Sequence, residues 1–495
     1  MGIQKELADI SRYRNAYALA ISAAMGSIFY GWDIGLIGGI LALPSFQESF
    51  GLIDKSPSEK ADLSGNIVGI LQVGCLRFFA GLGVGVVSAL VPSYVSESTP
   101  RAIRGRCTGM VQLANNLGIM LSFWVNYGVS KNMPSTDMQW RVPFIVQVIP
   151  GVLFIFFMLF QHESPRWLVE HEHYDKAADA LAFVSRKPAD DESVIITLNE
   201  IKADFLGKHQ LSTWTQFKKM GESRTTALRC FIPSLVMFFQ QWTGTNAINY
   251  FSPQIFAGLG IDGTTSGLFA TGVYGVVKVV SVGIVLIFAV ESLGRKKCLI
   301  IGGLGQGLMM IWIGGHSAVH PQSTVGPASY ISIAAVYLYA VFYCVGWGPV
   351  PWVVACETAP NHVRTAALSV AIAVNWLFSL TISKIVPLML NSIKYGTFLL
   401  FGCCCLIMVV WTYIFLPETT GVALENIRLL FEHDTVTRAL QEAPGGRIFL
   451  RGKRATSIAD LKAVKAGAEV EEPSSSVWSG YQVSRKRYSI AQERD

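Results

Sequence analysis

The sequence predicts an all-α polytopic membrane protein made of two helical bundles, with about ten membrane spans. Of the 495 residues, 51% are hydrophobic and only 15% are charged, and the mean hydropathy is +0.41. This composition is too apolar for a soluble protein of this size. Apolar runs long enough to cross a bilayer recur along the chain, and one long polar segment separates them into two groups.

Ten apolar runs are the predicted spans. A bilayer core takes about 20 apolar residues as a helix. Runs of about this length or longer cover residues 17–43, 63–95, 107–127, 142–160, 231–259, 268–290, 298–320, 330–355, 366–390 and 395–416. The first run follows Arg12 and Arg14 but has no cleavage site of small residues, so we interpret it as a retained span rather than a signal peptide.

The distribution of charge predicts the domain boundaries and the orientation. We expect a bundle over residues 1–160, a cytosolic linker over 161–228, a second bundle over 229–416 and a cytosolic, largely disordered tail over 417–495. Lys and Arg cluster in the connections near 101–106, 295–297 and 364, whereas the connections 260–267 and 321–328 have neither. The positive-inside rule therefore places both termini in the cytosol.

The two halves share a short repeat. ESTPRAIR from Glu97 to Arg104 and ETAPNHVR from Glu357 to Arg364 both have the pattern Glu-x-x-Pro-x-x-x-Arg at the cytosolic end of a span. Recurrence at the same topological place indicates an internal duplication, a common construction in transporters.

The duplication predicts that the first half lacks a segment. In the second half, Arg295 of the basic turn ESLGRKK lies 62 residues before Glu357. Counting the same distance back from Glu97 reaches Gly35, inside the first span, and no Gly-Arg-Lys turn lies between them. About two crossings are therefore missing, and the run 63–95 is expected to fuse parts of two helices, joined between Cys75 and Leu76. A splice form and a misjoined gene model both explain this, and we favour the second.

Several motifs together resemble a known family. In chain order they are GWDIGLIGG, PSYVSESTPRAIRGR, ESPRW, QQWTGTNAINYFSPQIF, ESLGRKK, GWGPVPWVVACE and PETTGVALENI. This set resembles the sugar porter family of the major facilitator superfamily and, within it, the fungal permeases for quinate, sugar acids and sugars. The resemblance implies the major facilitator fold with twelve spans, of which this chain offers about ten, and a monomer in the plasma membrane.

The resemblance also implies a function. It predicts transport of a sugar, a polyol or a cyclic sugar acid such as quinate by alternating access, with a proton as the coupling ion and no other cofactor. An uncoupled facilitative carrier, a nutrient sensor and a non-functional truncated product stay open as alternatives. No loop gathers His, Cys or paired carboxylates at a catalytic or metal-binding spacing, so we expect neither an enzyme nor a metal site, and no nucleic-acid partner.

Two charges inside apolar spans are candidates for proton coupling. Asp33 and Arg77 lie at comparable depths in their runs, and charges in hydrocarbon are costly unless they are paired. The resemblance implies that they form a proton relay. The alternative is a static buried pair that only orients two helices.

The candidate substrate residues are amides, one aromatic residue and one lysine. A sugar or polyol needs amides that both donate and accept, together with an aromatic surface. The resemblance assigns substrate contacts to Gln112, Gln240, Gln241, Asn246, Trp352 and Asn375. Hydrogen bonding between helices is the alternative for the amides, and ordinary packing is the alternative for the tryptophan.

Lys278 lies about a dozen residues from the cytosolic turn, too deep for easy snorkelling. We expect it to attract an anionic substrate such as quinate or a uronate. The alternative is a lysine that contacts a backbone carbonyl or reaches water.

Two further groups complete the predicted machinery. In GWGPVPW, Gly346, Pro349 and Pro351 are expected to allow a bend and form a gate, because proline removes backbone hydrogen bonds. Tyr250 and Phe251 resemble the family's aromatic gate. The resemblance also implies a cytosolic salt-bridge latch, weak in each single pair, made of Glu97 with Arg104, Glu291 with Arg295, and Glu357 with Arg364.

Overall fold

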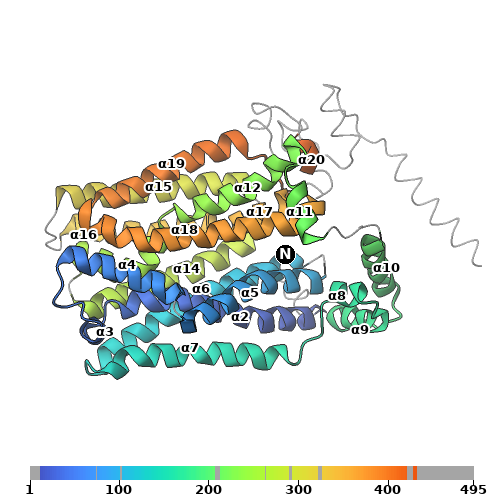
Figure 1. The fold of residues 1–495 in the computed structure, drawn as a ribbon, viewed down its shortest axis with the longest axis horizontal. Helices are drawn as coiled ribbons and strands as arrows, with labels where there is room; N and C mark the ends of the chain where they lie inside the picture. Colours follow the sequence, from blue (N-terminus) through green and yellow to red (C-terminus); the bar gives the residue numbers. More distant parts are fainter. Residues whose placement is uncertain are drawn as a thin grey trace, which may run out of the picture. The chain divides into compact units, whose positions relative to one another are not determined.

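The computed structural model describes residues 12–73, 75–100, 103–206, 212–261, 263–288, 293–320, 326–420 and 427–431. Every regular element in these ranges is a helix (Figure 1). The chain divides into two compact units, Met1–Leu416 and Pro417–Asp495. The described part of the second unit contains the single-turn helix α20 (Ile427–Leu430). The predicted disordered tail beyond Phe431 lies outside the described residues.

All ten predicted spans are helical. The first bundle consists of α2 (Arg14–Ile40), the short α3 (Pro44–Ser49), α4 (Pro57–Val73), α5 (Cys75–Ser98), α6 (Arg104–Asn132) and α7 (Asp137–Met158). The second consists of α12 (Arg224–Gln241), α13 (Thr245–Gly258), α14 (Thr264–Phe288), α15 (Arg295–Val319), α16 (Pro327–Val345), α17 (Val350–Thr358), the short 3-10 helix Asn361–Val363, α18 (Arg364–Ser392) and α19 (Gly396–Phe415). Each predicted apolar run therefore falls on one or two helices of the described part.

Seven helical stretches in the described part are long and apolar enough to cross a membrane by themselves. The other three predicted spans carry more polar side chains or are divided into two shorter helices. These are α4 with α5, α6, and α12 with α13.

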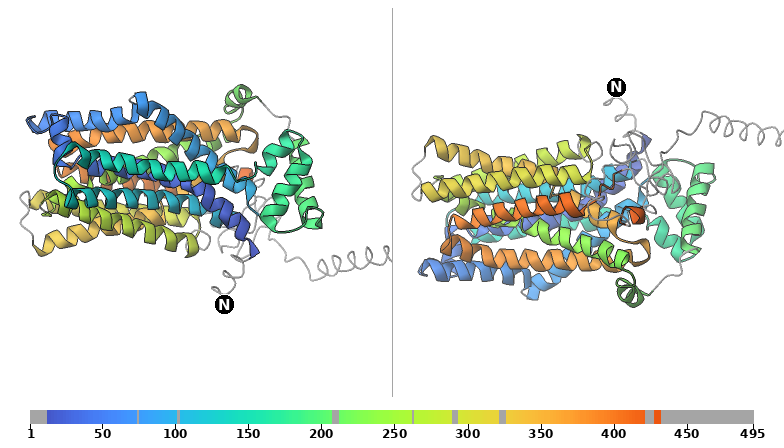
Figure 2. Two further views of the ribbon diagram at one scale, coloured as in Figure 1. Left: turned by 90° about the horizontal axis from the view of Figure 1, so that it is seen from below. Right: turned by 90° about the horizontal axis from the view of Figure 1, so that it is seen from above.

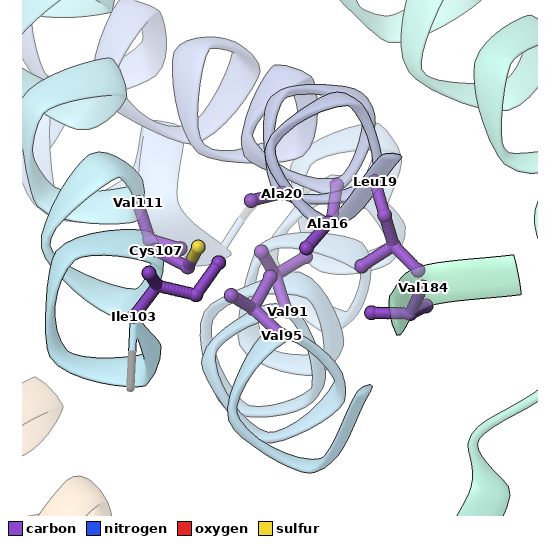
Figure 3. Close-up of a cluster of buried hydrophobic side chains, with 10 residues drawn as sticks. Ala16, Leu19, Ala20, Val91, Val95, Ile103, Cys107, Val111 and Val184 are labelled. Carbon is purple, nitrogen blue, oxygen red and sulfur yellow. The ribbon is translucent and has the colours of Figure 1, made fainter. Parts of the chain in front are cut away.

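The linker forms four short helices: α8 (Pro165–Glu170), α9 (Tyr174–Ser185), α10 (Glu192–Leu206) and α11 (Thr213–Lys219). Helices α8, α9 and α10 gather at one end of the bundles (Figure 2), which we call the linker end. Val184 of α9 joins a buried cluster with residues of α2, α5 and α6, among them Leu19 and Val95 (Figure 3). The amide of Asn15 donates to the carbonyl oxygen of Phe183 at 2.8 Å. The linker is thus fastened to the first bundle.

Among the described residues, the two bundles pack against each other mainly through three helix pairs. Helix α6 packs along α14, α2 packs against α13, and α4 packs against α18. Within the first bundle, α2 lies closest to α6. Glycines at positions 31, 35 and 39 recur every four residues along α2 and let the two backbones approach closely.

The predicted fused span corresponds to α4 and α5, two consecutive helices on either side of residue 74, which lies outside the described residues. The two helices have different neighbours. Helix α4 packs mainly on α18 of the second bundle, whereas α5 packs on α2 and α6 of the first. This division of contacts is what a junction between parts of two different spans would produce.

Candidate functional site

A polar cavity lies between the bundles and is lined by residues of both. The centre of a water molecule can reach about 80 Å³ of it, which is room for several waters or a small polar ligand. The lining consists of Tyr30, Ile34, Gln112, Asn115, Asn116, Ile119, Gln240, Gln241, Thr245, Asn246, Asn249, Tyr250, Lys278, Tyr343, Trp352, Asn375, Trp376 and Ser379. All seven predicted substrate residues are therefore brought to one cavity.

A turn between α12 and α13 positions the amide cluster. The sequence predicted one continuous span here, but α12 ends at Gln241 and α13 begins at Thr245. Gly244, between them, has φ +87°, a conformation that glycine adopts without steric cost. The turn brings Nδ2 of Asn246 within 2.6 Å of Oε1 of Gln241, and the same nitrogen donates to Oγ of Ser379 at 3.1 Å. The backbone break therefore aims both amides at the cavity.

The side chain of Gln240 forms hydrogen bonds to the chain segment between α16 and α17. Its Nε2 donates to the carbonyl oxygens of Trp347 at 2.8 Å and Gly348 at 3.0 Å, and its Oε1 accepts from Nδ2 of Asn375 at 2.9 Å. These carbonyls lie in the gap between α16, which ends at Val345, and α17. Gln240 thus makes the interhelical hydrogen bonds that the sequence left open as an alternative, while its side chain also borders the cavity.

Three of the described residues that line the cavity have a buried donor without a hydrogen-bond partner. They are Nδ2 of Asn115, on α6 of the first bundle, and Oγ1 of Thr245 and Nε1 of Trp376, on α13 and α18 of the second. The ring of Trp376 also meets the ring of Tyr30 edge to face, with centroids 5.7 Å apart. Because buried polar atoms are normally satisfied, the donors of Asn115 and Trp376 are candidates to bind ligand oxygens from the two bundles.

Lys278 is 2% exposed and borders the cavity from α14. Its Nζ donates to Oδ1 of Asn249 at 3.4 Å. The same nitrogen lies 5.3 Å from the ring centroid of Tyr343 and 5.7 Å from that of Tyr274. The ammonium group therefore has an amide oxygen and two aromatic faces as its neighbours.

The predicted coupling pair is described only in part. Oδ1 of Asp33 accepts a hydrogen bond from Nε2 of Gln147, on α7, at 3.1 Å. Asp33 is absent from the described cavity lining, although the next residue, Ile34, belongs to it. Arg77 lies in α5, but its side chain lies outside the described residues. Pairing between the two charges therefore stays a prediction.

The predicted gate residues lie at helix breaks. Tyr250 and Phe251 are almost fully buried in α13, and Phe251 departs from helical geometry with φ −123° and ψ 16°. Pro253 follows two residues later and lacks the N–H that would continue the helical hydrogen bonds. The carbonyl oxygens of Asn249 and Tyr250 come so close to α2 that a Cβ at Gly38 would lie 2.6 and 2.8 Å from them.

The second predicted gate is a complete interruption rather than a bend. Gly346 ends α16 with φ −120° and ψ −80°, Pro349 is the residue before α17, and Pro351 lies in its first turn, where proline is well tolerated. Cavity-lining residues stand on both sides of this interruption, Tyr343 before it and Trp352 after it.

One ion pair joins two of the predicted latch residues in a combination that the sequence did not predict. Nη2 of Arg295, at the start of α15, lies 3.0 Å from Oε1 of Glu357, near the end of α17. Its predicted partner Glu291 lies outside the described residues. Arg364 begins α18, directly after the short 3-10 helix. The observed ion pair therefore lies inside the second bundle.

In the first bundle, Glu97 accepts a hydrogen bond from Oγ of Ser164, at the start of the linker, at 2.7 Å. Arg104 is the first residue of α6, and its side chain lies outside the described residues. The predicted pair of Glu97 with Arg104 therefore stays a prediction.

Sequence reasoning missed several lining residues. Asn115 follows Gln112 by three positions and Asn249 follows Asn246 by three, so each pair shares a helix face. This spacing was a usable signal. Tyr30 and Tyr343 gave no such signal, because a tyrosine in an apolar span can pack against other helices as readily as it can line a cavity.

Comparison with known proteins identifies the family. The model of a family described as "Sugar (and other) transporter" matches residues 19–76 and 75–431, which is most of the chain. The chain belongs to this family, the sugar porters of the major facilitator superfamily. A probable quinate permease of Aspergillus fumigatus is 32% identical over 482 residues, covering 86% of this chain and 88% of that protein. The quinate permease of Emericella nidulans is also 32% identical and covers 86% and 90%.

Solved structures give the same fold. The proton:xylose symporter XylE bound to 6-bromo-6-deoxy-D-glucose matches with TM-score 0.68 and 23% identity, over 85% of this chain and all of that one. A partially occluded, inward-open form of XylE from E. coli matches with TM-score 0.67 and 22% identity, over 83% and 100%. The chain is thus a multi-pass membrane protein with the major facilitator fold, and its similar relatives are permeases rather than enzymes.

The family match is interrupted at the predicted junction. Its two parts meet at residues 75–76, where the sequence places the join between Cys75 and Leu76. The alignment with the Aspergillus fumigatus protein runs over 482 positions, whereas 86% of this chain is about 426 residues, a difference of about 56. A difference of this size corresponds to about two crossings with their connections.

Proposed function

We propose that this sugar porter moves a sugar, a polyol or a cyclic sugar acid across the membrane by alternating access, with the polar cavity as its substrate site. The observation that supports this most strongly is the pair of unpartnered donors, Asn115 and Trp376, which face one cavity from opposite bundles. A polyhydroxylated ring has oxygens to accept from both and an apolar face for the indole.

The site would couple substrate binding to the relative position of the bundles. A ligand that bridges α6 and α18 stabilises the arrangement in which the two helices are close, and its release removes that preference. The interrupted helices α12–α13 and α16–α17 place chain breaks beside the cavity, so half-helices can tilt without disturbing a whole span. In this proposal Tyr250 and Phe251, on the half-helix that touches α2, close the cavity.

Uptake of labelled probes tests this function. Host cells that lack their own carrier for the probe would express the chain and be offered ¹⁴C-quinate and ¹⁴C-D-xylose. Gln241→Leu should reduce uptake of any transported probe at least about tenfold, because it removes a hydrogen-bonding side chain from the cavity. Gln306→Leu is the matched control, since this glutamine is fully buried in α15 and does not belong to the described lining. Equal loss in both variants, at equal protein levels, would contradict the assigned site.

Proton symport is the proposed form of coupling. Asp33 is an ionisable side chain inside a span, hydrogen-bonded to Gln147 across to α7, and intramembrane carboxylates commonly serve proton relays. Protonation of Asp33 would weaken its attraction to Arg77 and so bias the switch between states. Asp33→Asn should abolish accumulation of substrate against its gradient while exchange of labelled for unlabelled substrate continues. Unchanged accumulation in the variant would show that coupling does not depend on Asp33, and absence of accumulation by the unsubstituted chain would favour the uncoupled carrier.

We also propose residence in the plasma membrane as a monomer with both termini in the cytosol. The clustering of Lys and Arg in the connections at the linker end supports this orientation. A protease applied to intact cells should leave an epitope at residue 495 uncut and remove it only after the cells are permeabilised.

A further inference from the structure

The charge of Lys278 is not explained by the protein around it. The residue is 2% exposed and lies at the middle of α14, a helix with the length and apolarity of a membrane span. An ammonium group at that depth is costly unless a counter-charge or several hydrogen bonds compensate it. The residues around Lys278 therefore show whether its charge is compensated within the protein.

The partners present are all neutral. None of the ion pairs found among the described residues, such as Arg141–Asp137, Lys187–Asp191 and Arg295–Glu357, includes Lys278. The cavity lining, as far as the structure describes it, contains no Asp or Glu. Lys278 has the long 3.4 Å hydrogen bond to Asn249 and the faces of Tyr274 and Tyr343. Aromatic faces attract a cation but leave its donors available.

The geometry of the cavity places those donors beside groups that suit hydroxyls. Lys278 shares the lining with the amides of Gln241, Asn246 and Asn115 and with the indole of Trp376. One ligand could therefore meet a positive charge, several amides and an indole ring together. Among the described residues that line the cavity, no other side chain is charged.

We propose that Lys278 binds the carboxylate of the substrate, so that the transported species is a polyhydroxylated monocarboxylate anion rather than a neutral sugar. This inference rests on the proposed function and names the substrate class of the same site. The carboxylate replaces the weak contact to Asn249 with a charge-assisted hydrogen bond, and the ring hydroxyls take the amides. Lys278 is in this account the residue that determines specificity.

Ligand binding to the purified chain in detergent micelles tests the proposal without requiring a complete transport cycle. The probes are D-galacturonate and D-galactose, which differ only in a carboxylate or a CH₂OH at C6, and quinate with its neutral carboxamide. Binding is measured as the ligand-dependent rise in melting temperature. The wild-type chain should bind each acid about tenfold or more tightly than its neutral partner.

Three variants separate charge from structure. Lys278→Gln should weaken binding of the acids about 10- to 100-fold and binding of the neutral probes less than about threefold. Lys278→Arg keeps the charge and should retain most of the preference for acids. Lys384→Gln removes an exposed lysine from α18 and is the matched control, with no expected change. Without ligand, Lys278→Gln should melt no lower than the wild type, because it removes an uncompensated buried charge.

Each outcome decides one claim. If the wild-type chain binds the neutral probes as tightly as the acids, or if Lys278→Gln weakens both equally, the carboxylate assignment is wrong while the substrate cavity stands. If neither acids nor neutral polyols bind, the proposed function itself fails, and this inference fails with it.

Discussion

The two bundles bury their last spans to very different extents. In α19, which ends the second bundle, 39% of the most apolar stretch is buried inside the protein, but in α7, which ends the first, only 11% is. The predicted gap in the first bundle would explain this. Helix α19 packs along α15, and the segment that we predict to be missing between Cys75 and Leu76 would contain the counterpart of α15. Apolar sequence alone makes a span, but burial requires another helix beside it.

The cavity does not share this asymmetry. Every described lining residue from the first bundle belongs to α2 or α6, and none belongs to α4 or α5 on either side of the junction. The predicted gap would therefore remove packing and connections from the first bundle, whereas the described cavity residues of that bundle lie on α2 and α6. We infer that the gap affects substrate binding less than it affects the movement of the two bundles during transport.

The largest expected effect concerns the transcript. If the gap comes from a misjoined gene model, the message across the codons for Leu71 to Gly85 contains about 56 additional codons between Cys75 and Leu76. The added residues should restore two crossings and the neighbour that α7 lacks. Sequencing of amplified message is the measurement. A message identical to the present sequence would show that the shortened form is real.

One substitution in α19 and one in α7 test whether the two last spans contribute differently to stability. Met408 in α19 is fully buried, whereas Ile149 in α7 is 56% exposed. Met408→Ala should destabilise the protein by about 2 kcal/mol or more, because the void removes packing contacts. Ile149→Ala should change the stability by no more than about 0.5 kcal/mol. Melting curves of the purified variants under one set of conditions test this, and equal losses would show that α7 is packed as tightly as α19.

The smallest effect concerns the ion pair of the second bundle. Arg295 and Glu357 are 16% and 20% exposed and 3.0 Å apart, so the pair should contribute up to about 1 kcal/mol. A double-mutant cycle with Arg295→Gln and Glu357→Gln measures that interaction energy. It should shrink as the salt concentration rises, because ions screen partly exposed charges. An interaction energy near zero at low salt would show that this ion pair does not hold α15 and α17 together.

Much of the fold and of the site could be predicted from the sequence, and the exceptions share a cause. Apolar runs indicated the helices. The family resemblance for Gln241 and the depth of a lone charge for Lys278 pointed to residues that line the cavity. The turn at Gly244 was missed because no proline or charge interrupts the run there. The contacts of Asp33 with Gln147 and of Arg295 with Glu357 were missed because they depend on how neighbouring helices are rotated. Periodicity gives the face of a helix but not which helix lies against it.

The central claim is that the substrate site is complete while the first bundle is not. The most direct test compares the present chain with one that carries, between Cys75 and Leu76, the corresponding segment of the Aspergillus fumigatus permease. Binding of ¹⁴C-quinate to purified protein and its uptake into proteoliposomes would be measured for both. We predict dissociation constants within about threefold of each other and clearly faster uptake by the chain with the segment. Loss of binding in the present chain, or equal uptake by both, would contradict the account.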